Sequence, residues 1–162
     1  MKTKYWIVYS FMMVFGFATI LTACSTAQEQ LSYKKAQLVG SETWQSTNSV
    51  DMLPSFLDES TEYNRSLYAN VGAHAHIMQE MNCYCGCMKG TKYDEAHDSL
   101  LRCYWAKTPD NTTEQAEIVW TDHSTTCGIC KLELQKVIEM QADGKSVEEI
   151  KTTIDQEYTG QH

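Results

Sequence analysis

The chain has 162 residues, 43% of them hydrophobic, and a formal net charge of −8 at pH 7. This length supports one modest folded domain. The acidic balance argues against nucleic acid and against anionic lipid surfaces as partners, because both bind basic patches.

The N-terminus has the features of an export signal. Two lysines precede an uncharged, apolar run over residues 5–21, and residues 21–24 read Leu-Thr-Ala-Cys, which is typical of a lipoprotein cleavage site. We predict a signal peptide over residues 1–23 and a diacylglyceryl lipid on Cys24, which anchors the chain at the extracytoplasmic face of the cell membrane. The alternative is an uncleaved transmembrane anchor, which needs roughly 17–25 apolar residues.

Residues 24–60 are rich in Ser, Thr, Gln, Glu and Asn and show no sustained hydrophobic period. This composition is typical of a flexible segment. We therefore predict a lipid-anchored polar linker over residues 24–60 and a cysteine-rich helical domain over residues 61–162.

The first predicted helix covers residues 62–81. Its apolar face follows helical spacing and consists of Leu67, Val71, His74 and Met78. On this face, His74 is best explained as a core histidine. Met78 and Met81 are likewise better explained as core residues than as ligands.

The C-terminal third predicts a helical hairpin. One helix starts at a cap among residues 124–126, and Gly144 is placed to end it. Its apolar face consists of Cys130, Leu134, Val137 and Ile138. A second helix follows from Ser146, which has capping-box spacing to Glu149. Its apolar face consists of Val147, Ile150, Ile154 and Tyr158.

The fold class expected from these elements is mainly α. We predict a small single helical domain with cysteine-rich loops and a C-terminal helical hairpin. A short two-stranded element, residues 117–120 paired near residues 101–105, completes this prediction.

Six of the seven cysteines lie in three groups in the second half of the chain: Cys83, Cys85 and Cys87; Cys103; Cys127 and Cys130. In an extended chain, alternate side chains are about 6.5–7 Å apart. One ion with sulfur bonds of about 2.3 Å cannot hold the first three in that shape. Gly86 permits a tight turn that gathers them. A disulfide within Cys-x-Cys is strained, so this triplet favours metal or partners elsewhere in the chain.

Cys127 and Cys130 form a Cys-x-x-Cys pair at a predicted helix start, where the helix dipole favours thiolate. His97 and His123 stand close in sequence to cysteines. Met78, Met81 and Met88 stand near the first triplet. Thiolate, thioether and imidazole together suit Cu(I) best and zinc second. The predicted metal ligands are Cys83, Cys85, Cys87, Cys103, Cys127, Cys130, His97 and His123.

Two alternative roles for the six cysteines stay open. Three disulfides can staple a small exported domain that has no chemistry of its own. Alternatively, Cys127 and Cys130 can exchange thiol for disulfide in a redox protein. No carboxylate pair or Ser/His/Asp arrangement stands out, so hydrolysis is not expected.

Residues 83–87, the stretch from His97 to Cys103 and the stretch from Asp122 to Cys130 together resemble the bacterial lipoproteins with a PCYCGC (Pro-Cys-Tyr-Cys-Gly-Cys) motif. Asn82 replaces the motif's proline. The resemblance covers about residues 68–160 and implies a membrane location and a shared Cys/His pattern, but no activity. We hypothesise a lipoprotein that binds Cu(I) for storage, delivery or resistance, and that exchanges it with a metal donor or acceptor protein.

Overall fold

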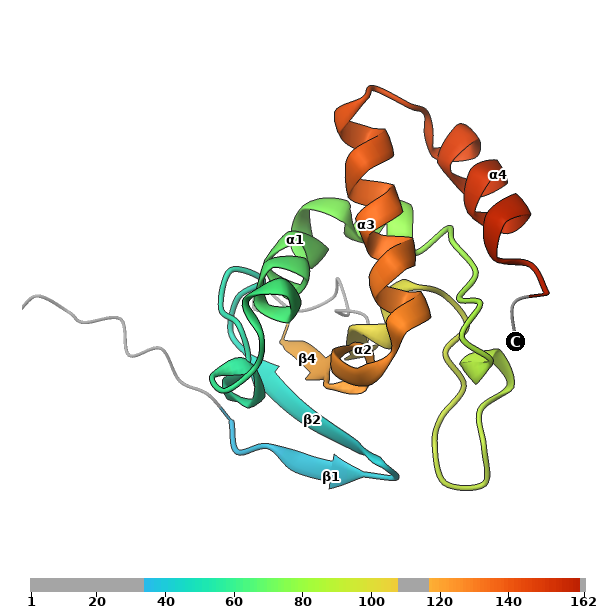
Figure 1. The fold of residues 1–162 in the computed structure, drawn as a ribbon. Coiled ribbons are helices and arrows are strands. Elements are labelled where there is room, and N and C mark those ends of the chain that lie inside the picture. The colour runs from blue at the N-terminus through green and yellow to red at the C-terminus, as the bar shows by residue number, and fades with distance from the viewer. Residues whose placement is uncertain (1–33, 108–116, 161–162) are drawn as a thin grey trace, which may run out of the picture. The chain divides into compact units, whose positions relative to one another are not determined.

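The computed structural model describes residues 34–107 and 117–160 (Figure 1). The predicted signal peptide, the lipidated Cys24 and the first part of the predicted linker lie outside these residues. Among the helices within them, none is both long and apolar enough to cross a membrane.

The helices are α1 (Glu62–Met78), α2 (His123–Thr126), α3 (Gly128–Ala142) and α4 (Val147–Tyr158). Three short 3-10 helices are η1 (Ser55–Leu57), η2 (Cys87–Lys89) and η3 (Leu101–Cys103). The strands are β1 (Gln37–Val39), β2 (Glu42–Thr47), β3 (Trp105–Lys107) and β4 (Ile118–Thr121).

These strands form one four-stranded sheet in the order β1-β2-β4-β3, and each neighbouring pair is antiparallel. Trp120 of β4 pairs with Trp105 on one side and with Gln45 of β2 on the other. The predicted pairing of residues 117–120 near residues 101–105 thus exists, but it is half of a larger sheet. The mainly α prediction is wrong, and the fold is mixed α/β.

The strand β2 escaped prediction because the side chains it buries are polar: Glu42, Gln45 and Thr47. The Gln45 Oε1 atom accepts a hydrogen bond of 2.7 Å from the Ser55 backbone N–H, and Thr47 Oγ1 accepts one of 2.8 Å from Trp120 Nε1. Partners of this kind make buried polar groups tolerable. Residues 37–47, which the sequence prediction gave to the linker, therefore contribute two strands to the sheet.

Helix α1 follows its predicted pattern. The Thr61 side chain caps its start by accepting from the Asn64 backbone N–H at 3.2 Å. All four residues of the predicted apolar face are buried. His74 is satisfied within the helix, since its Nδ1 atom lies 2.7 Å from the Asn70 carbonyl oxygen. Met78 and Met81 are buried in the hydrophobic core, as predicted.

The C-terminal hairpin is confirmed, with one change at its start. The predicted capping box of α4 is present: Ser146 Oγ accepts from the Glu149 N–H, and Glu149 accepts from the Ser146 N–H at 2.8 Å. Gly144 follows α3 with a φ of 75°. However, α3 begins at Gly128, and residues 123–126 form the separate helix α2. In Figure 1, α3 lies between α1 and α4.

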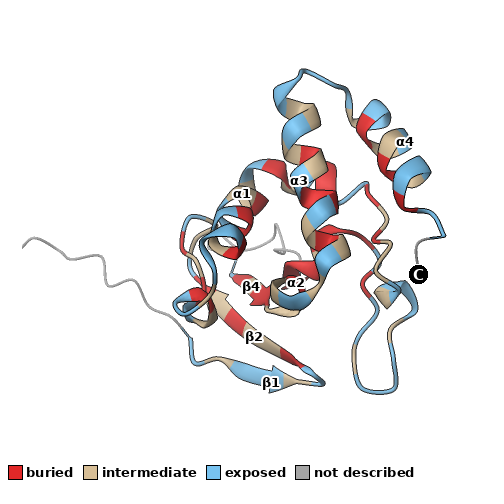
Figure 2. Cartoon of the chain, in the orientation of Figure 1, coloured by how far each residue is buried: buried red, intermediate tan, exposed pale blue. Residues whose placement is uncertain are grey.

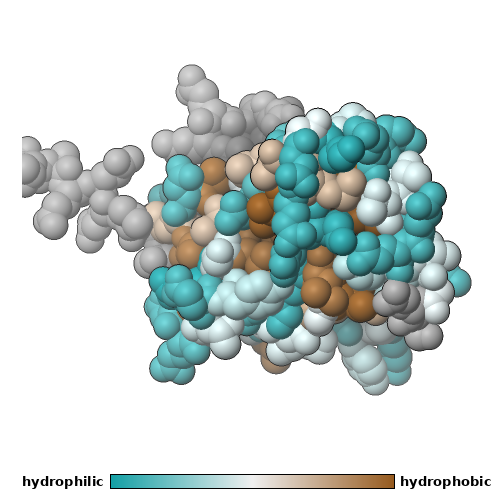
Figure 3. All heavy atoms as spheres, turned by 45° about the horizontal axis from the view of Figure 1, so that its top comes forward, coloured by the Kyte–Doolittle hydropathy of each residue, from teal (hydrophilic) through white to brown (hydrophobic). Residues whose placement is uncertain are grey.

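The core joins α1 to the sheet through aromatic rings that pack edge-on or tilted against one another. The Tyr68 ring lies 5.0 Å from the Tyr104 ring and 5.9 Å from the Trp120 ring, centroid to centroid. Its hydroxyl donates to the Thr121 carbonyl oxygen at 2.7 Å. Figure 2 shows buried residues on α1, α3, α4 and β4, and on the face drawn in Figure 3 hydrophilic side chains surround several hydrophobic patches. Cys103 and Cys130 belong to this core, so the site borders it.

Candidate metal centre

The turn at Gly86 gathers the Cys83–Cys87 segment. Gly86 has a φ of 88°, and the 3-10 helix η2 starts directly after it. This left-handed conformation is open to glycine at little cost. The Cys87 carbonyl oxygen then accepts a hydrogen bond of 3.1 Å from the His97 N–H. The predicted role of Gly86 is confirmed, and the loop after it brings His97 back to the sulfurs.

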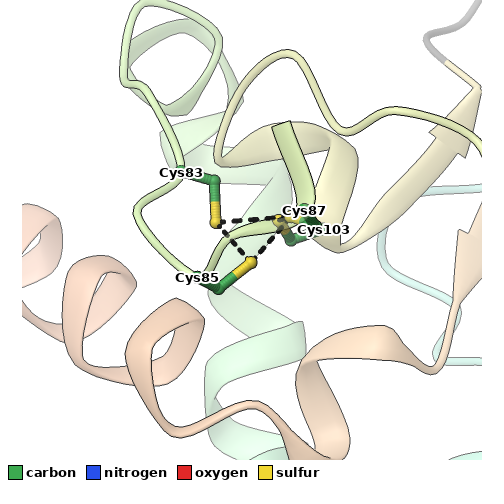
Figure 4. Close-up of side chains that lie close together, drawn as sticks. All are labelled: Cys83, Cys85, Cys87 and Cys103. Carbon is green, nitrogen blue, oxygen red and sulfur yellow. Dashed lines mark hydrogen bonds between the residues drawn. The ribbon is translucent and has the colours of Figure 1, made fainter. Parts of the chain in front are cut away.

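Four sulfurs converge where this segment meets η3 (Figure 4). The Sγ atom of Cys85 lies 3.1 Å from that of Cys83 and 2.7 Å from that of Cys87. The Sγ atom of Cys87 lies 3.9 Å from that of Cys83 and 3.8 Å from that of Cys103. In a tetrahedral site with bonds of ~2.3 Å, sulfurs sit ~3.8 Å apart. The separations from Cys87 to Cys83 and to Cys103 therefore match ligands of a common ion, whereas the two separations from Cys85 are shorter.

The Cys-x-x-Cys pair meets the same sulfurs from the start of α3. Cys127 is the N-cap residue of α3, and its Sγ atom lies 3.1 Å from that of the fully buried Cys130. The Cys130 sulfur in turn lies 3.6 Å from the Cys83 sulfur. The six cysteines of the described domain are all free thiols.

Both predicted histidines are present and share one carboxylate. His123 Nδ1 lies 3.0 Å and His97 Nε2 lies 3.2 Å from the Glu42 Oε1 atom. The other nitrogen of His123, Nε2, lies 3.7 Å from the Cys85 sulfur. Within the described structure, His97 Nδ1 is buried and has no hydrogen-bond partner. Each ring thus keeps one nitrogen for a ligand, as metal-binding histidines do.

Glu42 belongs to the candidate site, and the sequence prediction missed it. It is buried, and its second carboxylate oxygen accepts from Thr121 Oγ1 at 2.7 Å. Burial opposes its ionisation, but the hydrogen bonds from His123 and His97 outweigh this and hold the pKa of Glu42 well below its usual range. The carboxylate is therefore charged and orients both rings.

Glu133 of α3 is a second residue that was missed. Its Oε1 atom accepts a hydrogen bond of 2.8 Å from the Tyr84 backbone N–H, which fixes the loop between Cys83 and Cys85. Burial raises the pKa of Glu133 to about 8. The sequence gives no sign that Glu133 fixes this loop, because Tyr84, its hydrogen-bond partner, lies 49 residues away.

Full ionisation of the six thiols requires a cation in the cluster. Burial raises the pKa of the Cys103 thiol well above its usual value. Burial lowers the pKa of His97, but Cys87 and Glu42 outweigh this and raise it to about 9. Six thiolates this close repel one another strongly, so they can all ionise only with positive charge between them.

All eight predicted ligands meet in one region, and in the described residues they form three overlapping groups that can hold a metal ion. In each group, one candidate atom per residue lies within 4.8 Å of the others. The groups are Cys83, Cys85, Cys87 and Cys103; Cys85, His123, Cys127 and Cys130; and Cys87, His97, Cys103 and His123. Sulfur and imidazole donors fit a soft or borderline ion.

A family model described as "Protein of unknown function with PCYCGC motif" matches residues 13–162. No curated protein and no solved structure matches the chain.

Proposed function

The chain belongs to the family of proteins of unknown function with a PCYCGC motif, and from its Cys/His cluster we propose that it binds Cu(I) at the outer face of a membrane, for storage, delivery or resistance. Zinc is the second candidate. The proposal includes a metal donor or acceptor protein as partner, because a storage or delivery protein must exchange its ion.

One observation carries this proposal: six free thiols and two buried or half-buried imidazoles share one small region. Thiolate-rich sites favour Cu(I) and zinc over harder ions. Glu42 supports it further, since a carboxylate behind a histidine is the usual outer partner of a metal ligand.

The location rests on the sequence. The apolar run over residues 5–21 and the Leu-Thr-Ala-Cys stretch ending at Cys24 favour a cleaved signal peptide and a lipid anchor. A diacylglyceryl group supplies two acyl chains, which is enough for stable anchoring.

The test is metal binding by the full-length protein, purified in detergent without oxygen. We expect it to retain Cu(I) against a chelator, to prefer Cu(I) over zinc in competition, and to lose binding when Cys85→Ser and Cys87→Ser are combined. Lys89→Ser is the control, because it changes an exposed residue two positions after Cys87 and removes neither a sulfur nor an imidazole. Unchanged stoichiometry in the double variant would refute the proposal.

A second candidate is thiol–disulfide exchange by Cys127 and Cys130, whose sulfurs lie 3.1 Å apart at the start of α3. Cys127 is half-buried and Cys130 fully buried, an asymmetry that suits an attacking and a resolving thiol. A redox titration discriminates the two functions. If the pair is a redox centre, Cys127 and Cys130 must interconvert between dithiol and disulfide even with Cu(I) bound. If the pair binds metal, bound Cu(I) should protect both thiols from oxidation.

A further inference from the structure

The donor groups contain more ligands than one ion can use. A tetrahedral ion takes four ligands, whereas the cluster offers six sulfurs and two imidazoles. The first two groups together use seven different donors and share only Cys85. A thiolate sulfur has enough lone pairs to bind two ions at once, so Cys85 can belong to both positions. Its sulfur lies 3.1 Å from that of Cys83 and 2.7 Å from that of Cys87, so these sulfurs must move apart to reach the ~3.8 Å spacing around one ion.

The third group does not add an independent position. It takes Cys87 and Cys103 from the first group and His123 from the second. His123 cannot serve two ions, because its Nδ1 atom is committed to Glu42 at 3.0 Å and only Nε2 faces the sulfurs. The first and second groups therefore form the pair of positions that shares a single thiolate and no imidazole. His97, which only the third group contains, then binds neither ion and remains a partner of Glu42.

The two positions differ in their access to solvent. A pocket of about 260 Å³ opens onto the second group and is lined by Glu42, Cys85, His123 and Cys127 among others. From the first group, only Cys85 lines it. Cys83 and Cys103 are 1% and 0% exposed and Cys87 is half-buried, whereas only Cys130 is buried in the second group, so the first position is the more buried of the two.

We propose that the protein holds two soft metal ions bridged by the Cys85 thiolate. The inner ion is bound by Cys83, Cys85, Cys87 and Cys103. The outer ion is bound by Cys85, His123, Cys127 and Cys130. This inference rests on the proposed metal binding and extends it: the outer ion is the exchangeable one, and the inner ion is retained.

The exchange route follows from the pocket. An incoming thiolate or thioether reaches the outer ion through the opening beside Cys127 and His123, and takes it by stepwise ligand replacement. No oxidation is involved, since each sulfur ligand is replaced by another sulfur. The partner is therefore a carrier with accessible soft ligands and not one that offers only carboxylates.

The experiment is a Cu(I) titration of the full-length protein in detergent under anaerobic conditions, read by native mass spectrometry. We expect two Cu(I) per chain in the wild type and one in Cys127→Ser, which loses an outer ligand but leaves the inner four intact. Thr126→Ala is the matched control: it lies in the same pocket, next to Cys127, and carries no soft donor, so it should still hold two.

A second readout tests the inner and outer assignment. With excess water-soluble Cu(I) chelator, half of the copper should leave the wild type quickly and half slowly, and Cys127→Ser should show the slow phase alone. One ion in the wild type, two in Cys127→Ser, or a single extraction phase would each overturn the two-ion centre while keeping metal binding. No copper at all in the wild type would instead overturn the proposed function.

Discussion

At the scale of single residues, Glu42 holds the two histidines of the site through one carboxylate oxygen. Replacing it by Gln keeps the shape and removes the charge that orients both rings. We expect Glu42→Gln to weaken Cu(I) binding by about 10- to 100-fold, the usual effect of losing an outer-shell partner. Competition against a chelator of known affinity measures this change.

The control for that variant is Glu59→Gln, which removes the same charge from an exposed position. It should leave the affinity unchanged. Urea unfolding of the metal-free forms separates positioning from stability. If Glu42 acts only by orienting the rings, the variant loses Cu(I) affinity but keeps most of its free energy of unfolding. Equal affinity in Glu42→Gln and wild type would contradict the positioning role.

The eight donors could be named from the sequence because cysteine and histidine are rare and carry their chemistry in their side chains. Glu42 and Glu133 could not. Glu42 contacts His123 across 81 residues and Glu133 contacts Tyr84 across 49. Carboxylates are common on surfaces, so nothing in the sequence marks the two that fold inward.

At the scale of elements, the turn at Gly86 decides whether three sulfurs can meet. A side chain at its φ of 88° is strained, although the space around it is open. We expect Gly86→Ala to cost roughly 1–2 kcal/mol in metal-free stability and to lower Cu(I) affinity. Denaturant unfolding and chelator competition on the same preparation measure both.

Gly128→Ala is the matched control for that turn. Gly128 also stands next to a cysteine and also has open space around it, but it starts a helix without a positive φ. Alanine should be tolerated there or should stabilise α3 slightly. Equal losses in the two variants would show that the left-handed turn is not the cause.

The capping box of α4 should contribute to stability and not to metal binding. Ser146→Ala removes the acceptor for the Glu149 N–H, so we expect a loss of about 1 kcal/mol in the free energy of unfolding. Cu(I) stoichiometry should not change. Thr152→Ala, at an exposed position inside α4, should not destabilise. An unchanged unfolding midpoint in Ser146→Ala would count against the cap.

Elements differ in how well the sequence predicts them, for a physical reason. Helices α1, α3 and α4 each bury an apolar stripe at helical spacing, which one segment shows by itself. Strand β2 buries Glu42, Gln45 and Thr47, whose burial depends on partners elsewhere in the chain, such as Ser55 and Trp120. The sequence of β2 alone therefore does not predict that this segment is a strand.

At the scale of the whole molecule, the metal site joins segments that are otherwise separate. Its donors come from the Cys83–Cys87 segment, the loop at His97, η3, α2 and the start of α3. An ion that binds them in the folded state alone stabilises the fold by mass action, by about 2.7 kcal/mol at a free concentration 100 times Kd. We expect Cu(I) to raise Tm and its removal by a chelator to reverse the rise. An unchanged Tm in the presence of Cu(I) would contradict a metal site that joins these segments.

The state of the thiols in the native protein tests the central claim most directly. Full-length protein is isolated from membranes without oxygen, its metal content is measured, and its thiols are counted after denaturation with chelator. We expect bound copper and six reactive thiols, from Cys83, Cys85, Cys87, Cys103, Cys127 and Cys130. No metal, no reactive thiols and a mass lower by six hydrogens would mean three disulfides, and would contradict it.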